Sequence, residues 1–368
     1  MKKPIKTTVW LVLVLSLSLI LLSCGNGTPE ETTTTVQTTE TTTDETTTEP
    51  DDTDATREET TDQDDEYEPA DIRIGALRGP TGMGLVHLMA SQDAGTAANH
   101  YQFELASAPD EIVASLTSGQ VDIAAVPTNL AAVLYQRTNQ RVKLLAVNTL
   151  GVLYILEDGD TVQTVADLEG KTIESTGQGA VPEYALNYVL AENGLTDLVE
   201  IVFRSEHAEL ATLAVAGQSD LVMLPEPFVT SVLSQNSDFR IALDLTQEWQ
   251  AVEAAQGRSS ELAMGALVVS SDFAEQHPQA LARFLEEFEA SADAANANPA
   301  LTGELVEQYG IMPSAQVAAR AIPNANIVAI YGSDMQPMLE PFFEVLYSAN
   351  PQSVGGTLPD DDFYFVAP

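Results

Sequence analysis

From residue 71 onward, short apolar runs alternate with longer segments in which apolar residues recur at helical spacing. Short runs rich in Val, Ile and Leu and bounded by Gly, Pro or Asp are typical of strands, and the longer periodic segments are typical of helices. The alternation of the two predicts an α/β fold. The expected strands are 72–77, 101–105, 121–126, 142–147, 150–156, 171–174, 199–203, 220–224, 240–243 and 264–269.

The expected helices carry signals at their ends. The helix at 109–118 has Asp110 and Glu111 in its first turn, and Gly119 follows it. Acidic residues favour the start of a helix, and a glycine directly after it favours its end. The other expected helices are 84–91, 128–136, 181–193, 208–216, 227–233, 278–294, 299–308 and 335–347.

One short pattern occurs twice. Gly119-Gln-Val-Asp122 precedes a strand that ends at Pro127, and Gly217-Gln-Ser-Asp220 precedes a strand that ends at Pro225. In each copy a helix comes before the pattern, and another helix follows the proline. The repeat predicts two similar lobes whose equivalent loops face each other across a cleft. Two ordinary helix-to-strand turns are the alternative explanation.

The N-terminus has the features of a secretory signal. Lys2, Lys3 and Lys6 precede an apolar run at 9–22, which is too short for a membrane-spanning helix of roughly 20 apolar residues. The order Leu21-Leu-Ser-Cys24 resembles the lipobox of bacterial lipoproteins. That resemblance implies a signal peptide at 1–23, lipidation of Cys24 and anchoring outside the cytoplasmic membrane. An ordinary secreted protein is the alternative.

A region of low complexity follows the signal. Residues 24–70 consist mainly of Thr, Glu, Asp and Pro, so this stretch has little apolar surface to bury. Such composition is typical of disordered chain, and its negative charges extend it by repulsion. We expect a disordered acidic spacer that holds a folded domain away from the membrane. An acidic interaction tail is the alternative.

Charge and cysteine content exclude several functions. The chain has 55 acidic against 15 basic residues, a net charge of −40, which argues against binding to nucleic acid. Cys24 is the only cysteine, so lipidation leaves no thiol for a disulfide, a thiolate metal site or cysteine catalysis. The four histidines lack the His-Glu-x-x-His spacing. We therefore expect no metal and no cofactor.

The order of elements and two turns carry a family resemblance. The turns are Ala-Val-Pro-Thr-Asn at 125–129 and Leu-Pro-Glu-Pro-Phe at 224–228. With the paired Gly-Gln-x-Asp signatures, they resemble extracytoplasmic solute-binding proteins of nitrate, sulfonate, taurine and thiamine-pyrimidine-precursor importers. The resemblance covers roughly 71–350 and implies capture of a small molecule and delivery to an ABC permease. The lipobox adds contact with the membrane through the lipid anchor on Cys24. We expect a monomer.

The resemblance also implies a two-lobed, type II periplasmic-binding-protein fold. Its hinge would consist of two crossing segments, near 156–160 and near 261–266. The first lobe would comprise 71–157 plus 265–368, and the second lobe 158–264.

Five loops are candidates for the binding site. In open α/β sheets, ligands bind beyond the carboxyl ends of strands, where helix N-termini offer free N–H groups. The loops at 78–84, 127–129, 148–150, 175–179 and 225–228 fit this description. They could also be no more than helix caps and turns. The candidate ligand-binding residues are Gly79, Pro80, Thr81, Gly82, Thr128, Asn129, Asn148, Thr176, Gly177, Gln178, Glu226 and Phe228.

The charges in these loops indicate a ligand class. Arg78 is the only base, whereas Glu226 places a carboxylate at the expected cleft. An anion would normally meet Arg or Lys, so the loops favour a neutral or amine-bearing ligand, such as an aminopyrimidine. Phe228 or Tyr184 could stack on its ring. A sulfonate, taurine or nitrate is the alternative, because helix dipoles alone can hold an anion.

Two other functions compete with transport. A sensory lipoprotein that presents its ligand to a membrane receptor would have the same binding lobes. An enzyme on the same fold is disfavoured, because the chain has no Gly-x-Ser-x-Gly elbow and Gly170-Lys-Thr172 lacks the upstream glycine of a phosphate loop. We expect that the protein is not an enzyme.

Overall fold

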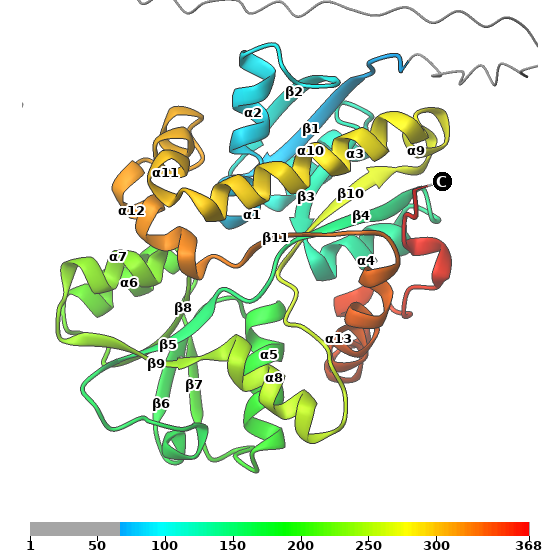
Figure 1. Cartoon of the computed structure of the whole chain (residues 1–368). Helices are drawn as coiled ribbons and strands as arrows, with labels where there is room; N and C mark the ends of the chain where they lie inside the picture. Colours follow the sequence, from blue (N-terminus) through cyan, green and yellow to red (C-terminus); the bar gives the residue numbers. More distant parts are fainter. Residues whose placement is uncertain (1–66, 368) are drawn as a thin grey trace, which may run out of the picture. The chain divides into compact units, whose positions relative to one another are not determined.

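The computed structural model describes residues 67–367. The expected signal peptide (1–23), Cys24 and all but the last four residues of the expected spacer (24–70) lie outside the described residues. Helices and strands of residues 67–367 form two sheets with helices around each, which confirms the α/β class (Figure 1). Within this range, no helix has the length and apolar character needed to cross a membrane.

The first lobe is built on a six-stranded sheet with the order β11-β4-β10-β3-β1-β2. Its strands are β1 (Asp71–Leu77), β2 (His100–Ala106), β3 (Ile123–Pro127), β4 (Val142–Thr149), β10 (Gly265–Ser270) and β11 (Ile327–Ile330). Its helices are α1 (Pro80–Met83), α2 (Val86–Asp93), α3 (Pro109–Thr117), α4 (Thr128–Arg137), α9 (Ser271–Gln276), α10 (Pro278–Ala297), α11 (Pro299–Gln308), α12 (Ala315–Ala321) and α13 (Met335–Ala349).

The second lobe is built on a five-stranded sheet with the order β7-β6-β8-β5-β9. Its strands are β5 (Leu153–Asp158), β6 (Thr172–Ser175), β7 (Glu200–Phe203), β8 (Leu221–Pro225) and β9 (Phe239–Asp244). Its helices are α5 (Val181–Glu192), α6 (His207–Val215), α7 (Phe228–Gln235) and α8 (Leu245–Ala255).

The two sheets repeat one plan. In the first, β1 pairs in parallel with β2 and β3, and β10 is antiparallel to β3 and β4. In the second, β6 pairs in parallel with β7 and β8, and β5 is antiparallel to β8 and β9. The repeated sequence pattern therefore marks equivalent strands, β3 and β8. Gly119 and Gly217 precede them with φ of +73° and +65°, a conformation that glycine adopts without strain.

The chain crosses between the lobes at 150–152 and again at 256–264. The first crossing lies earlier than expected, because β5 pairs with β8 and β9 and so belongs to the second sheet. The sequence prediction merged 150–152 with this strand. Gly151 instead packs so closely on α8 that a Cβ there would overlap Oγ1 of Thr246. The second crossing ends at β10 and overlaps the expected segment 261–266.

Five elements escaped prediction: α1, α8, α9, α12 and β11. Four of them are no longer than seven residues, too short for a clear period. The fifth, α8, begins where the Asp244 carboxylate accepts a hydrogen bond from the backbone N–H of Thr246 at 2.9 Å. Asp244 is an N-cap whose signal the sequence analysis missed.

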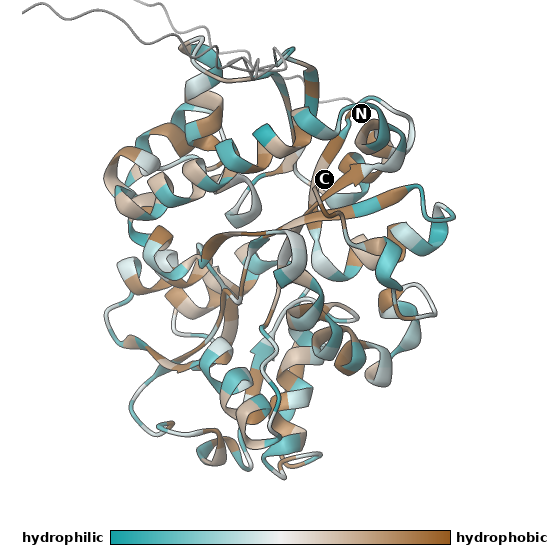
Figure 2. Ribbon diagram, turned by 45° about the vertical axis from the view of Figure 1, so that its right-hand side comes forward, coloured by the Kyte–Doolittle hydropathy of each residue, from teal (hydrophilic) through white to brown (hydrophobic). Residues whose placement is uncertain are grey.

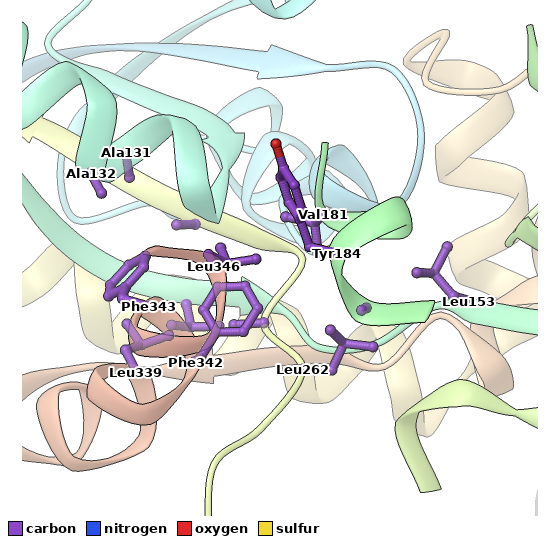
Figure 3. Close-up of a cluster of buried hydrophobic side chains, with 14 of the residues drawn as sticks. Ala131, Ala132, Leu153, Val181, Tyr184, Leu262, Leu339, Phe342, Phe343 and Leu346 are labelled. Carbon is purple, nitrogen blue, oxygen red and sulfur yellow. The ribbon is translucent and has the colours of Figure 1, made fainter. Parts of the chain in front are cut away.

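One hydrophobic cluster contains residues of both lobes. Phe342, Phe343 and Leu346 on α13 belong to it, together with Leu153 and Val181 of the second lobe (Figure 3). Figure 2 shows hydrophobic residues along the strands and on parts of the helices, and hydrophilic ones on many outer turns. Because α13 packs against α5 as well as the first lobe, it joins the two lobes outside their sheets.

Candidate ligand-binding site

A cavity of about 530 Å³ is lined by residues of both lobes. The loop after β1 and the loop after β8 form two of its walls, so the cavity lies beyond the carboxyl ends of strands, as expected for open α/β sheets. The lining residues are Leu77, Arg78, Gly79, Pro80, Thr81, Thr149, Val152, His207, Pro225, Glu226, Pro227, Phe228, Ser231, Met264, Ile311, Met312, Pro313, Ser314 and Val317.

Five of the twelve candidate residues line this cavity. Gly79, Pro80 and Thr81 come from the first lobe, and Glu226 and Phe228 from the second. The structure thus brings together residues about 145 positions apart in the sequence. Whether they contact a ligand stays a prediction.

The remaining first-lobe candidates lie behind the cavity wall. Gly82 is packed under the carbonyl oxygen of Leu77. The Asn148 side-chain amide donates to the carbonyl oxygen of Thr81 at 3.1 Å and so holds the loop that carries Thr81. Asn129 donates to the carbonyl oxygen of Ser353 at 3.2 Å, which turns its side chain toward the C-terminal segment.

Thr128 differs from these neighbours. Its side chain is fully buried, and its hydroxyl has no hydrogen-bond partner within residues 67–367. Its backbone N–H donates to the carbonyl oxygen of Met264 at 3.3 Å, and Met264 lines the cavity. A buried hydroxyl without a partner is unfavourable, so this position is one where a ligand atom or a water would be stabilised.

Of the candidates at 176–178, Thr176 contacts a residue that lines the cavity. The Thr176 hydroxyl hydrogen-bonds Nδ1 of His207 at 2.5 Å, and His207 lines the cavity. Gly177 has a φ of +78°, and Gln178 is exposed. Neither Gly177 nor Gln178 is among the lining residues, and Tyr184 packs in the cluster around α13 instead (Figure 3).

Sequence reasoning missed two parts of the wall. His207 begins α6 directly after β7, the same kind of position as the loops that were chosen, so the strand-end rule could have found it. The segment from Ile311 to Ser314 joins α11 to α12 and follows no strand. No pattern in the sequence indicated that it would reach the cavity.

Glu226 is the most unusual group in the cavity. Its side chain is almost fully buried, yet no cationic side chain of the described chain pairs with it. One carboxylate oxygen accepts from the backbone N–H of Thr230 at 3.1 Å, and the other from the Thr230 hydroxyl at 2.9 Å and from the Asn324 amide at 3.4 Å. Burial raises the pKa of Glu226 above its ordinary value, and these hydrogen bonds oppose the shift only in part.

An aromatic pair stands beside Glu226 on the same wall. The rings of His207 and Phe228 lie with their centroids 5.3 Å apart and tilted by 40°. Burial lowers the pKa of His207, and the charge of Glu206 opposes this only in part, so the neutral form of the imidazole is favoured. With Nδ1 engaged by Thr176, Nε2 is the ring nitrogen without a partner among residues 67–367.

Arg78 is the only arginine or lysine among the lining residues. Its Nη1 donates to the carbonyl oxygen of Gly310, and the residue is exposed. Within the described part of the chain, no group of three or more His, Cys, Asp or Glu side chains could hold a metal ion. The cavity therefore offers apolar contact, one unpaired carboxylate and a neutral imidazole.

Residues 96–315 match a family described as the periplasmic phosphonate substrate-binding protein of an ABC transporter. The chain belongs to this family. It is a periplasmic substrate-binding protein of an ABC importer, which confirms the resemblance inferred from the sequence. The matched range includes every strand of the second sheet and most of the first. Members of this family are transport proteins rather than enzymes.

Solved structures show the same fold. An ABC transporter protein from Parabacteroides distasonis is 24% identical, with a TM-score of 0.66, 80% of this chain covered and 98% of that one. The periplasmic aliphatic sulphonate binding protein SsuA from Escherichia coli is 16% identical, with a TM-score of 0.61 and coverages of 78% and 94%. The alkanesulfonate-binding protein SsuA from Xanthomonas axonopodis pv. citri, solved with bound MOPS, is 18% identical, with a TM-score of 0.56 and coverages of 77% and 94%.

These similarities confirm the two-lobed, type II periplasmic-binding-protein fold. No protein with a curated function matches the chain.

Proposed function

We propose that this substrate-binding protein captures a small neutral or amine-bearing molecule with an apolar body, such as an aminopyrimidine, in the cavity between its lobes. Glu226 is the polar anchor for the ligand. The observation that carries the proposal is a buried carboxylate that lines the cavity and has no cationic partner in the described chain. Ligand N–H groups would donate to this carboxylate in place of the cationic partner that it lacks.

The energetics favour a ligand that donates hydrogen bonds. A buried carboxylate is unfavourable unless it is paired or fully hydrogen-bonded, and hydrogen bonds that involve a charged group are the stronger ones. Negative groups also surround this end of the cavity. Burial, with the charges of Asp244 and Glu226, raises the pKa of the Tyr154 hydroxyl. An anion placed here would be repelled, whereas an amino group would be attracted.

The remaining walls suit a flat apolar body. Apolar side chains from both lobes line most of the cavity, and its volume lies within the range of small-molecule sites, roughly 300–1,000 Å³. The tilted pair of Phe228 and His207 offers a ring on which a heterocycle can stack.

An anion is the second candidate. The family is described by phosphonate, two of the similar structures are sulfonate-binding proteins, and α6 and α7 both begin at the cavity. Helix N-termini attract anions. Here, however, the Glu226 carboxylate already accepts from the first turn of α7, and Arg78 donates to Gly310. The first turn of α7 and the Arg78 guanidinium are thus already engaged, which leaves the N-terminus of α6 as the remaining group that would attract an anion. This is why we favour the amine-bearing ligand.

We further propose that Cys24 carries the lipid anchor and that 24–70 is the spacer. The lobes follow the sheets, with 71–152 plus 265–367 in the first lobe and 153–264 in the second. A sensory role would use the same cavity. Co-purification with an ABC permease would support transport, and co-purification with a membrane receptor would support sensing.

A thermal-shift screen of the full chain tests the ligand class. The panel contains 4-aminopyrimidine and related heterocycles, taurine, methanesulfonate, methylphosphonate and nitrate. We expect saturable stabilisation by an aminopyrimidine in the wild type and in Glu248→Gln, and its loss in Glu226→Gln. Glu248 is the matched control, because burial raises its pKa too but it does not line the cavity. Stabilisation by an anion alone, unchanged in Glu226→Gln, would contradict the proposal.

A further inference from the structure

Three groups from different elements meet beside the cavity. Tyr154 lies on β5, Glu226 follows β8, and Asn324 ends a short 3₁₀ helix, η2 (Ile322–Asn324). The Tyr154 hydroxyl donates to the carbonyl oxygen of Asn324 at 2.9 Å, and the Asn324 side-chain amide donates to Glu226 at 3.4 Å. Tyr154 and Glu226 belong to the second lobe, whereas η2 leads into β11 of the first. These hydrogen bonds therefore connect the lobes.

The backbone around Asn324 is fixed to the first lobe. Ile322 and Ala325 are buried in the hydrophobic cluster of that lobe. The carbonyl oxygen of Asn326 accepts from the backbone N–H of Leu150 at 3.0 Å, and its side-chain amide donates to Gly151 in the first crossing segment. The Asn324 side chain thus extends toward Glu226 from a backbone that is held on both sides.

Within residues 67–367, Asn324 is also the one partner of the Glu226 carboxylate that lies outside α7. The other donors, the backbone and hydroxyl of Thr230, lie one turn along α7 and stay with Glu226 however the lobes move. Asn324 stays with the first lobe. When the lobes separate, Glu226 and the Tyr154 hydroxyl each lose their partner on Asn324, and water replaces both.

We propose that Asn324 is a positioning residue that orients Glu226 from the opposite lobe and so couples the approach of the lobes to the presentation of the carboxylate. That the carboxylate then meets a ligand rests on the proposed function; the coupling between Asn324 and Glu226 does not. A ligand that engages Glu226 favours the joined lobes, and joined lobes favour the ligand, by the reciprocity of linked equilibria.

The test measures the lobe separation without any ligand. Cys24 is the only native cysteine, so the full chain with Cys24→Ser accepts spin labels only at introduced sites. Exposed Glu304 in the first lobe and Gln218 in the second are replaced by Cys and labelled. Pulsed electron paramagnetic resonance then gives the ratio of separated to joined lobes.

We expect Asn324→Ala to raise this ratio about fivefold, the size that the loss of one hydrogen bond gives. Tyr154→Phe, which removes only the bond to the Asn324 backbone, raises it less. Asn296→Ala is the matched control, because the Asn296 amide donates to Ile327 at 2.8 Å within the first lobe, and it leaves the ratio unchanged.

Coupling between the two residues decides the proposal. In a double-mutant cycle, we expect Asn324→Ala to change the ratio of separated to joined lobes very little when Glu226→Ala is already present. Additive effects, or a wild-type ratio in both Asn324→Ala and Tyr154→Phe, would overturn it. Addition of 4-aminopyrimidine to the wild type is a separate arm. If no shift toward joined lobes follows while the cycle shows coupling, the ligand class is wrong and the positioning role stands.

Discussion

Two carboxylates of the second lobe are buried to the same degree and are held in opposite ways. Glu226 and Glu253 each keep about 1% of their surface exposed. Glu253 pairs with Arg258 at 2.6 Å and accepts from Tyr188 at 2.5 Å and from Ser260 at 2.7 Å. Among residues 67–367, the Glu226 carboxylate has only a neutral hydroxyl, a backbone N–H and an amide as donors.

The pKa values follow these surroundings. Burial raises the pKa of Glu253, but the hydrogen bonds from Arg258, Tyr188 and Ser260 and the charge of Arg258 outweigh it, so the net shift is downward. For Glu226, burial prevails and the net shift is upward. The comparison teaches that burial alone does not mark a binding residue. A buried carboxylate beside a cavity, without a cationic partner among residues 67–367, is the feature from which we infer a binding role for Glu226.

The largest effect on folding is expected at Glu253. Glu253→Gln removes the charge that pairs with Arg258 and disturbs the hydrogen bonds that lead through Ser260 to Trp249. We expect a loss of about 2 kcal/mol in the free energy of unfolding, below the roughly 3–5 kcal/mol of a fully buried pair, because Arg258 keeps 35% of its side chain exposed. Urea denaturation measures it. We expect ligand selectivity to stay as in the wild type. A change in selectivity would contradict the proposed difference between Glu253 and Glu226.

Glu226→Ala should have the opposite effect to Glu253→Gln, with a large loss of affinity and a small change in stability. We expect the affinity for an aminopyrimidine to fall about 30-fold, because a hydrogen bond to a charged group is worth about 2 kcal/mol. Stability changes by less than about 1 kcal/mol, since the variant removes an unfavourable buried charge along with its hydrogen bonds. Calorimetric titration and urea denaturation of the same sample measure both. A large loss of stability with intact affinity would show that Glu226 only caps α7.

The pH dependence of stability separates the two carboxylates by sign. The ordinary glutamate pKa is 4.5, and the folded-state pKa of Glu226 lies above it. Its contribution to stability is present below pH 4.5 and is lost as pH rises through the raised value. The pKa of Glu253 lies below 4.5, so its contribution is present above pH 4.5 and is lost as pH falls through the lowered value.

Unfolding free energies at pH 3 to 8 test this in matched variants. The stability of Glu226→Gln relative to the wild type should rise above pH 4.5, and the stability deficit of Glu253→Gln should shrink below it. Parallel curves for both variants would contradict the assignment of the two shifts.

The smallest effect is expected at Thr128, which occupies the equivalent position in the first lobe. Thr128→Val keeps the shape and removes the hydroxyl without a partner. We expect about a threefold loss of affinity, the lower end for a neutral hydrogen bond, with stability unchanged or slightly higher. A loss as large as that of Glu226→Ala would show that both copies of the repeat contact the ligand equally.

Much of the fold could be predicted, because apolar runs and glycine stops report local structure. The repeat around Gly119 and Gly217 identified equivalent strands, since a helix end with a positive φ needs glycine at the same place in each lobe. The first lobe boundary could not be predicted, because Leu150 to Val152 are as apolar as β5. Only pairing with β8 shows where the strand begins.

The site was predictable where loops follow strands and not elsewhere. Glu226 stands in such a loop, and Phe228 opens the helix that follows it. The segment from Ile311 to Ser314 reaches the cavity through the packing of α11 and α12, which leaves no local signal. Nor could the sequence separate Glu226 from Glu253, because the partners of Glu253 come from α5 and the second crossing and are brought to α8 by the fold.

We propose above all that Glu226 selects the charge of the ligand. Calorimetric titration of the wild type and of Glu226→Gln, each with 4-aminopyrimidine and with methanesulfonate, tests this directly. We expect the wild type to bind the aminopyrimidine in preference to the sulfonate and Glu226→Gln to lose this binding. Tight binding of methanesulfonate by the wild type, equal or stronger in Glu226→Gln, would contradict it.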